Sequence, residues 1–401
     1  MKQSGRTLWR AASLCGEQKA LWGLANNMTD TLLAAFRKIM QMSDTQTSFI
    51  QMAFYGAYFC LALPAALFIR KHSYKSGVIL GLCLYALGAI LFLPAASAAS
   101  YAFYLIAIYI MAAGCSVLET TANPYIMSMG SPETATRRLN IAQSFNPIGS
   151  ILGILVSKYF ILQDISLYSV SGTYAAVGGV LIAIMVVMLF AKMPEGQDTA
   201  KQDSLGATLK RLFKNRKYSF GVIAQFFYVG AQIGVWSFTI RLAMKELGMV
   251  EAQAATLYLI SIIGFCASRF VYTWLMKYVT PQRLLAAGSV LSTLCALLVV
   301  LTDGWLCVVC LILISIFMSL MFPTIYGIAL GSVSESEHKD DTKIGASGLI
   351  MAILGGALLT PLQGMVSDHS NINVSYLVPM CCFLVVLAFA LSTSRRLKPD
   401  A

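Results

Sequence analysis

The stretch "YAFYLIAIYIMAAGCSVLETTANPYIMSMG", residues 101–130, sets a carboxylic acid, Glu119, within a long apolar run. About 20 apolar residues are enough to cross the hydrocarbon of a bilayer as a helix. An ionisable group inside such a helix is costly, and function is the default explanation for it. Away from water a carboxylic acid favours its protonated form, and it ionises when water reaches it. The stretch therefore indicates a membrane helix with a proton-binding group; the alternative is a structural bond to an amide across a helix interface.

The composition supports a membrane protein. Of the 401 residues, 58% are hydrophobic and 12% are charged, whereas a soluble protein carries about 25% charged residues. The ten cysteines show no zinc-ligand spacing and the three histidines lie in polar loops, so we expect no metal and no cofactor. No phosphate-binding loop and no nucleophile–base pair is visible. The chain is therefore not expected to be an enzyme or an ATP-driven pump.

Twelve apolar runs divide the chain into two sets of six. A polar stretch at 193–216 separates a predicted six-helix bundle at 20–192 from a second at 217–393, with tails at 1–19 and 394–401. The fold class is therefore all-α, with twelve transmembrane helices. The predicted spans are 20–41, 48–69, 77–96, 101–129, 140–162, 172–192, 217–240, 253–276, 282–301, 305–331, 344–366 and 374–393.

Basic residues set the orientation, because lysine and arginine collect on the cytoplasmic side of membrane proteins. With the N-terminus inside, 23 of the 29 basic residues fall in cytoplasmic segments, five fall outside, and Arg269 lies within a span. We therefore expect both termini in the cytoplasm, and the net charge of +11 needs no nucleic-acid partner. Arg269 is about two turns from a cytoplasmic loop, where it is expected to snorkel towards water or to brace the inner gate.

The two halves of the chain resemble each other, as a duplicated six-helix unit predicts. Aligning "ANNMTD" (25–30) with "AQIGVW" (231–236) sets Asn26 against Gln232 and Asp30 against Trp236. The acid of the first half is thus replaced by an aromatic residue in the second.

A second alignment gives the same contrast. Setting "ETTANPYIMSMG" against "MSLMFPTIYGIALG" brings together Pro124 and Pro323, both expected to disturb their helices, and places Glu119 opposite Met318. We therefore expect the first half to handle protons and the second to supply an apolar or stacking wall.

Amide and aromatic side chains accompany the acids in the predicted spans. Amides donate and accept hydrogen bonds, as sugar hydroxyls require, and aromatic rings can stack on a sugar ring. In span five, "RLNIAQSFNPIGSILG" places Gln143 and Asn146 roughly on one helix face. The alternatives are bonds between helices for the amides and ordinary packing for the aromatics. The candidate proton-coupling residues are Asp30 and Glu119, and the candidate sugar-binding residues are Asn26, Asn27, Gln143, Asn146, Gln232, Trp236, Phe322 and Tyr326.

Four blocks of the sequence resemble the L-fucose permease (fucose:proton symporter) family of the major facilitator superfamily. They are "LWGLANNMTDTLLAAF", "VLETTANPYIMSMGSPE", "RLNIAQSFNPIGSILG" and "AQFFYVGAQIGVWSFTIR", and the likeness runs from about Leu21 to Leu391. The resemblance implies two six-helix bundles, alternating access and import of a monosaccharide, most simply L-fucose, with a proton. Phe322 stands where the family has a tyrosine. The residues that match the family's proton and sugar residues are Asp30, Glu119, Asn27, Gln143, Asn146 and Trp236.

Two other functions remain open from the sequence. One is a glucose/galactose symporter of the same family, and the other is a membrane sugar sensor that binds without transporting. The expected setting is a monomer in the lipid bilayer of a bacterial inner membrane, crossing it many times. Its expected partners are a monosaccharide and a proton.

Overall fold

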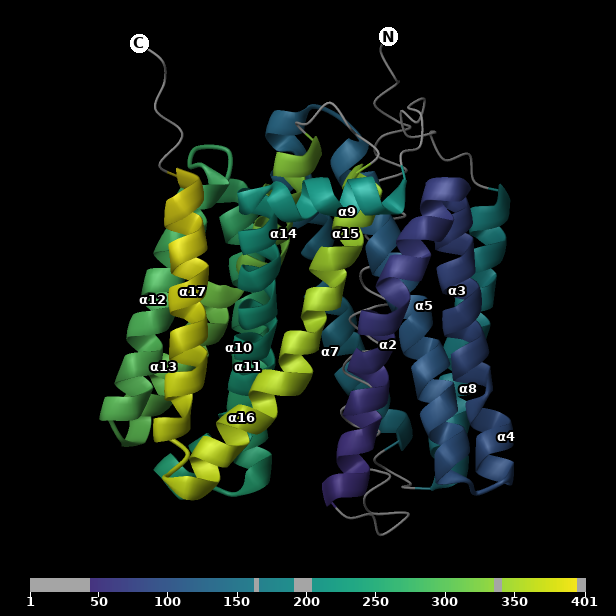
Figure 1. The fold of residues 1–401 in the computed structure, drawn as a ribbon. Helices are drawn as coiled ribbons and strands as arrows, with labels where there is room; N and C mark the ends of the chain where they lie inside the picture. Colours follow the sequence, from purple (N-terminus) through teal and green to yellow (C-terminus); the bar gives the residue numbers. More distant parts are fainter. Residues whose placement is uncertain (1–43, 162–165, 191–203, 335–340, 395–401) are drawn as a thin grey trace, which may run out of the picture. The chain divides into compact units, whose positions relative to one another are not determined.

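The computed structural model describes residues 44–161, 166–190, 204–334 and 341–394, which form helices joined by short turns (Figure 1). The chain separates into two compact units. In the described residues, the first unit contains 44–130, 145–161, 166–190 and 341–351, and the second contains 131–144, 204–334 and 352–394. Each unit thus includes one short segment from the other half of the sequence. The predicted bundles at 20–192 and 217–393 stay a prediction.

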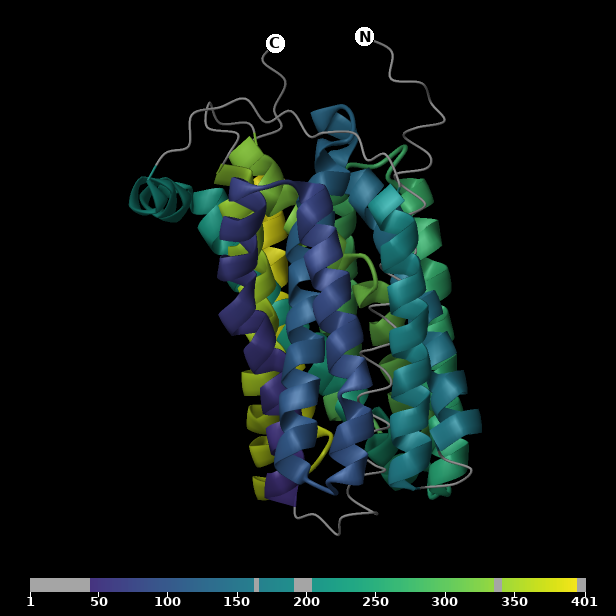
Figure 2. The same cartoon turned by 90° about the vertical axis from the view of Figure 1, so that its right-hand side faces the viewer.

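Helix α5 (Tyr101–Ser128) lies at the centre of the first unit, against α2, α3 and α15. Figure 2 shows the long helices of this unit side by side. Serine hydroxyls cap the first turn of several of them; Ser73 accepts from the Ser76 N–H and Ser100 from the Phe103 N–H. The other elements of the unit are α2 (Asp44–Lys71), α3 (Tyr74–Ile90), α4 (Phe92–Ser97), α7 (Asn146–Val156), η2 (Ser157–Ile161), α8 (Leu167–Phe190) and α15 (Asp341–Met351).

Helix α10 (Arg216–Leu247) has the corresponding place in the second unit, in contact with α11, α13, α14, α16 and α17. Asn215 caps its start by accepting from the Tyr218 N–H, and Gly248, with φ of 61°, ends it in the left-handed conformation. The other elements are η1 (Pro132–Thr134), α6 (Ala135–Gln143), α9 (Leu205–Lys214), α11 (Glu251–Leu275), α12 (Pro281–Leu301), α13 (Gly304–Met318), α14 (Met321–Ser334), η3 (Ala352–Leu354), α16 (Gly355–His369), η4 (Val374–Tyr376) and α17 (Leu377–Ser394).

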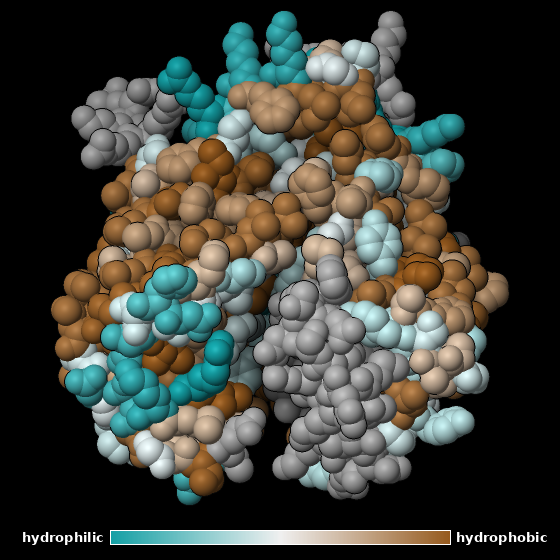
Figure 3. Space-filling model, turned by 60° about the horizontal axis from the view of Figure 1, so that its bottom comes forward, coloured by the Kyte–Doolittle hydropathy of each residue, from teal (hydrophilic) through white to brown (hydrophobic). Residues whose placement is uncertain are grey.

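Ten candidate membrane spans occur in the described residues, judged by length and apolar composition. They match ten of the twelve predicted runs, and hydrophobic side chains cover much of the surface seen in Figure 3. The first predicted span, 20–41, lies outside the described residues. The fifth, 140–162, is wrong as a single helix, because α6 ends at Gln143 and α7 begins at Asn146. The 193–216 stretch, predicted as a polar linker, contains helix α9.

Helices α3 and α5 approach each other closely at glycines. A Cβ atom at Gly114 would overlap the backbone nitrogen of Tyr85, and one at Gly88 would overlap the backbone nitrogen of Met111. Small residues of this kind let membrane helices pack backbone against backbone. The contact sets the position of α5, and through α5 the position of Glu119.

Replacing Gly114 with alanine is therefore expected to destabilise the protein by about 1–3 kcal/mol, because α3 and α5 must move apart. The matched control is Gly179→Ala in α8, where a Cβ meets nothing within 4 Å. The control should leave stability unchanged or slightly raise it, since alanine is the better helix former by up to ~1 kcal/mol. Thermal unfolding of both variants in detergent measures the difference. Equal melting temperatures would show that the contact between α3 and α5 tolerates a methyl group.

Candidate functional site

The carboxyl group of Glu119 is buried, in helix α5 of the first unit. Its side chain is 2% exposed, and Asn123, one helical turn later, donates a hydrogen bond from Nδ2 to Glu119 Oε2 at 2.7 Å. Ser116 and Thr120 of the same helix are also fully buried. The acid is therefore buried beside an amide partner, among other polar side chains of its own helix.

The other candidate acid, Asp30, lies outside the described residues, as do Asn26 and Asn27. Their roles stay predictions. Among the residues that the structure does describe, no group of three or more His, Cys, Asp or Glu side chains could hold a metal ion.

The structure corrects the placement of Gln143 and Asn146 on one face of a continuous helix. Gln143 is the last residue of α6 and Asn146 is the first of α7, with a turn at 144–145 between them. Pro147 weakens the helix at this point, because proline has no N–H to give to the carbonyl four residues earlier. Both side chains are at most 9% exposed. They belong to different units, Gln143 to the second and Asn146 to the first.

The aromatic candidates of the second unit hold defined contacts. Trp236 is half-buried; its Nε1 donates to Ser315 Oγ at 3.3 Å, and its ring meets that of Phe265 edge to face with centroids 5.0 Å apart. The rings of Phe322 and Tyr326 stack with centroids 6.4 Å apart. The indole is thus oriented by a hydrogen bond and a ring contact while part of it stays accessible.

Gln232 lies in α10, one turn before Trp236, and is half-buried. Tyr326 in α14 is fully buried. The second unit therefore contains Gln143, Gln232, Trp236, Phe322 and Tyr326, while Glu119 and Asn146 belong to the first unit.

The guanidinium of Arg269 does not snorkel to water, as one of its two predicted roles required. Its side chain is 3% exposed, and it donates from Nη1 to the carbonyl of Gln143 at 2.7 Å and from Nε to the carbonyl of Ser319 at 2.8 Å. The sequence shows an arginine within a span, but it does not show which backbone groups it reaches.

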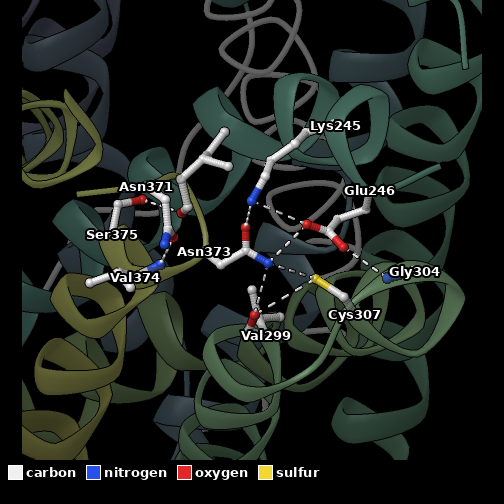
Figure 4. Close-up of polar contacts among 10 residues, drawn as sticks. Lys245, Glu246, Val299, Gly304, Cys307, Asn371, Asn373, Val374 and Ser375 are labelled. Carbon is white, nitrogen blue, oxygen red and sulfur yellow. Dashed lines mark hydrogen bonds and ion pairs between the residues drawn. The ribbon is translucent and has the colours of Figure 1, made fainter. Parts of the chain in front are cut away.

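A polar cluster at the end of α10 has no local signal in the sequence (Figure 4). Asn373 is its centre: Oδ1 accepts from Lys245 Nζ at 2.6 Å, and Nδ2 donates to Glu246 Oε1 at 3.0 Å. The other oxygen of Glu246 accepts from the Gly304 N–H at 2.8 Å. The cluster ties the end of α10 to the start of α13 and to the turn before η4. The three segments that form the cluster are 58 or more positions apart, so only their spatial arrangement reveals it.

Comparisons with known proteins identify relatives along nearly the whole chain. Residues 20–353 match the model of the Major Facilitator Superfamily. The "L-fucose-proton symporter" of Haemophilus influenzae is 41% identical, with 94% of this chain and 95% of the relative covered. The "Glucose/galactose transporter" of Brucella abortus is 30% identical, with 94% and 92% covered.

A solved structure is similar as well. The crystal structure of the Major Facilitator Superfamily transporter FucP in the outward conformation aligns with a TM-score of 0.86 at 35% identity. The alignment covers 95% of this chain and 98% of that one. These relatives are named as transporters, which agrees with the prediction that the chain is not an enzyme. This chain therefore has the same all-helical fold as that transporter.

Proposed function

Because this chain belongs to the major facilitator superfamily, and is thus a multi-pass membrane protein, we propose that it imports a monosaccharide together with a proton by alternating access. The observation that carries the proposal is the 41% identity to an L-fucose–proton symporter over 94% of the chain. The buried Glu119 agrees with it, since a proton-coupled carrier needs a group that exchanges a proton away from bulk water.

L-Fucose is the proposed substrate. The relative named for L-fucose is 41% identical, whereas the relative named for glucose and galactose is 30% identical over a similar length. The second relative supports glucose or galactose as the alternative substrate. Phe322 bears on this choice, because a phenylalanine offers a sugar a ring face without a hydroxyl group.

The proposed division of labour follows the two units. Glu119, with Asp30, exchanges the proton, and Asn26, Asn27 and Asn146 contribute amides to the sugar from the same half of the chain. In the second unit, Gln143 and Gln232 offer hydrogen bonds, and Trp236 and Phe322 offer ring surfaces, with the buried Tyr326 stacked against Phe322. Their orientation by Ser315, Phe265 and neighbouring rings supports this assignment.

The proposed setting is a bacterial inner membrane, with a monomer whose two termini face the cytoplasm. The distribution of basic residues, 23 against five, supports this orientation, because positively charged loops stay on the cytoplasmic side.

Sugar competition in proteoliposomes tests the substrate. The purified protein is reconstituted, an inward proton gradient is imposed, and uptake of labelled L-fucose is measured against a panel of unlabelled hexoses and 6-deoxyhexoses. We expect L-fucose to accumulate against its gradient, and a protonophore to abolish the accumulation. L-Fucose should compete best in the panel. Stronger competition by glucose or galactose would establish the alternative substrate, and uptake unaffected by the protonophore would contradict proton symport.

A further inference from the structure

Two of the predicted spans are interrupted near a proline in the same way. In span five the helix stops after Gln143 and resumes at Asn146, and Pro147 follows. In an unbroken helix the Gln143 carbonyl would accept from the N–H of residue 147, but proline has none. The local sequence therefore removes the ordinary helical donor for this carbonyl.

Span ten has the same construction. Helix α13 ends at Met318 and α14 begins at Met321, with a turn at 319–320 and Pro323 shortly after. The carbonyl four residues before this proline is that of Ser319. It loses its helical donor for the same reason as Gln143.

One side chain supplies both carbonyls with a donor. The guanidinium of Arg269 donates from Nη1 to Gln143 at 2.7 Å and from Nε to Ser319 at 2.8 Å, all within the second unit. Its carbon Cζ lies over the Phe265 ring, 4.7 Å from the ring centre, and this cation–π contact further stabilises the guanidinium. The planar guanidinium presents donors in several fixed directions, so one arginine can reach two carbonyls that a single ammonium would serve less well.

We propose that Arg269 is a positioning residue that replaces the two helical hydrogen bonds removed by Pro147 and Pro323 and thereby holds both helix breaks in place. The breaks carry residues of the proposed sugar site, since Gln143 ends α6 and Phe322 immediately precedes Pro323. Arg269 thus sets the positions of an amide and an aromatic ring. The positioning of sugar-site residues rests on the proposed function. The two hydrogen bonds from Arg269 to the carbonyls, called the clamp below, do not depend on it.

A double-mutant cycle on the full-length protein tests the clamp. Arg269→Gln is expected to lower the melting temperature in detergent by ~5–10 °C, because two buried carbonyls lose their donor. Replacing both Pro147 and Pro323 with alanine restores the two backbone N–H groups. In that background Arg269→Gln should cost about half as much or less, since contacting groups in one network are not additive. Arg269→Lys should be intermediate.

The matched control is Arg241→Gln. Arg241 is an exposed arginine whose Cζ lies 4.3 Å from the centre of the Phe238 ring, so its replacement removes a similar charge and ring contact. It should shift the melting temperature by no more than ~1–2 °C in either background, as expected of an exposed site. If Arg269→Gln costs the same with and without the prolines, or no more than Arg241→Gln, the clamp is refuted.

Sugar binding supplies a readout that separates positioning from general stability. At a temperature where every variant remains folded, Arg269→Gln should weaken equilibrium binding of L-fucose by about tenfold, and the control should leave it unchanged. An unchanged affinity would refute the positioning role. Failure of the unaltered protein to bind any sugar would overturn the proposed function instead, and it would leave the melting cycle as a valid test of the clamp.

Discussion

Replacing Glu119 with glutamine is expected to abolish the accumulation of sugar against its gradient while exchange of sugar across the membrane survives in part. Glutamine has nearly the same shape as the protonated acid and can still bond to Asn123, but it cannot release a proton. A gradient of one pH unit stores about 1.4 kcal/mol per proton, enough for ~tenfold accumulation when one proton accompanies each sugar. The variant should bring the ratio of internal to external sugar down to about one.

The measurement compares two transport assays on the same proteoliposomes. Uptake driven by an imposed pH gradient reports coupling, and exchange of labelled for unlabelled sugar at equal pH reports binding and conformational change. Glu133→Gln is the matched control, because Glu133 is an exposed carboxylate in the short helix η1. The control should accumulate sugar normally. Undiminished uphill uptake by the Glu119 variant would end its role in proton coupling, and loss of coupling in both variants would show that the effect is not specific to the buried acid.

Removing the indole of Trp236 should weaken the apparent affinity for sugar by about tenfold, or ~1.4 kcal/mol, with proton coupling intact. The ring is half-buried and held by Ser315 and Phe265, so it offers the sugar a pre-oriented surface. Alanine removes that surface but leaves the carboxyl of Glu119 unchanged. Trp236→Phe keeps an aromatic face and loses the hydrogen bond to Ser315, so its affinity for sugar should lie between those of the unaltered protein and Trp236→Ala.

Concentration-dependent uptake under a fixed pH gradient measures this effect. The half-saturating sugar concentration should rise in Trp236→Ala. At a sugar concentration well below saturation, uptake by the variant should be slower, but the final ratio of internal to external sugar should be the same. Trp305→Ala is the control, because Trp305 lies in the first turn of α13 and is 62% exposed. If the Trp236 variant keeps the original half-saturating concentration, the indole does not contact the sugar.

The elements with strong sequence signals were predicted well. The 101–129 run became α5 (Tyr101–Ser128), and the 282–301 run became α12 (Pro281–Leu301). Apolar length is a local property, and crossing hydrocarbon requires each backbone group to bond within its own helix. The burial of Glu119 was predicted for the same reason, because a membrane helix carries its acid into the interior.

The helix breaks were predicted less well. Pro124 and Pro323 were aligned as equivalent helix-disturbing residues, yet α5 continues through Pro124, whereas span ten is interrupted at 319–320, shortly before Pro323. The break in span five accompanies Pro147, where the apolar run had predicted a continuous helix. Proline removes one hydrogen bond wherever it occurs, and the neighbouring helices decide whether the chain bends, stays straight or divides.

Residue types along the chain were enough to predict the apolar runs, the orientation and the presence of a carboxylic acid in a membrane helix. The runs reflect the free energy of moving each side chain from water into hydrocarbon, which depends on residue type and little on distant neighbours, and the orientation reflects the bias of basic residues between loops. Tertiary packing was needed to show that one arginine serves the carbonyls of Gln143 and Ser319, and that Asn373 joins Lys245 to Glu246. Hydrogen bonds act over about 3 Å, so packing of distant segments determines such partners.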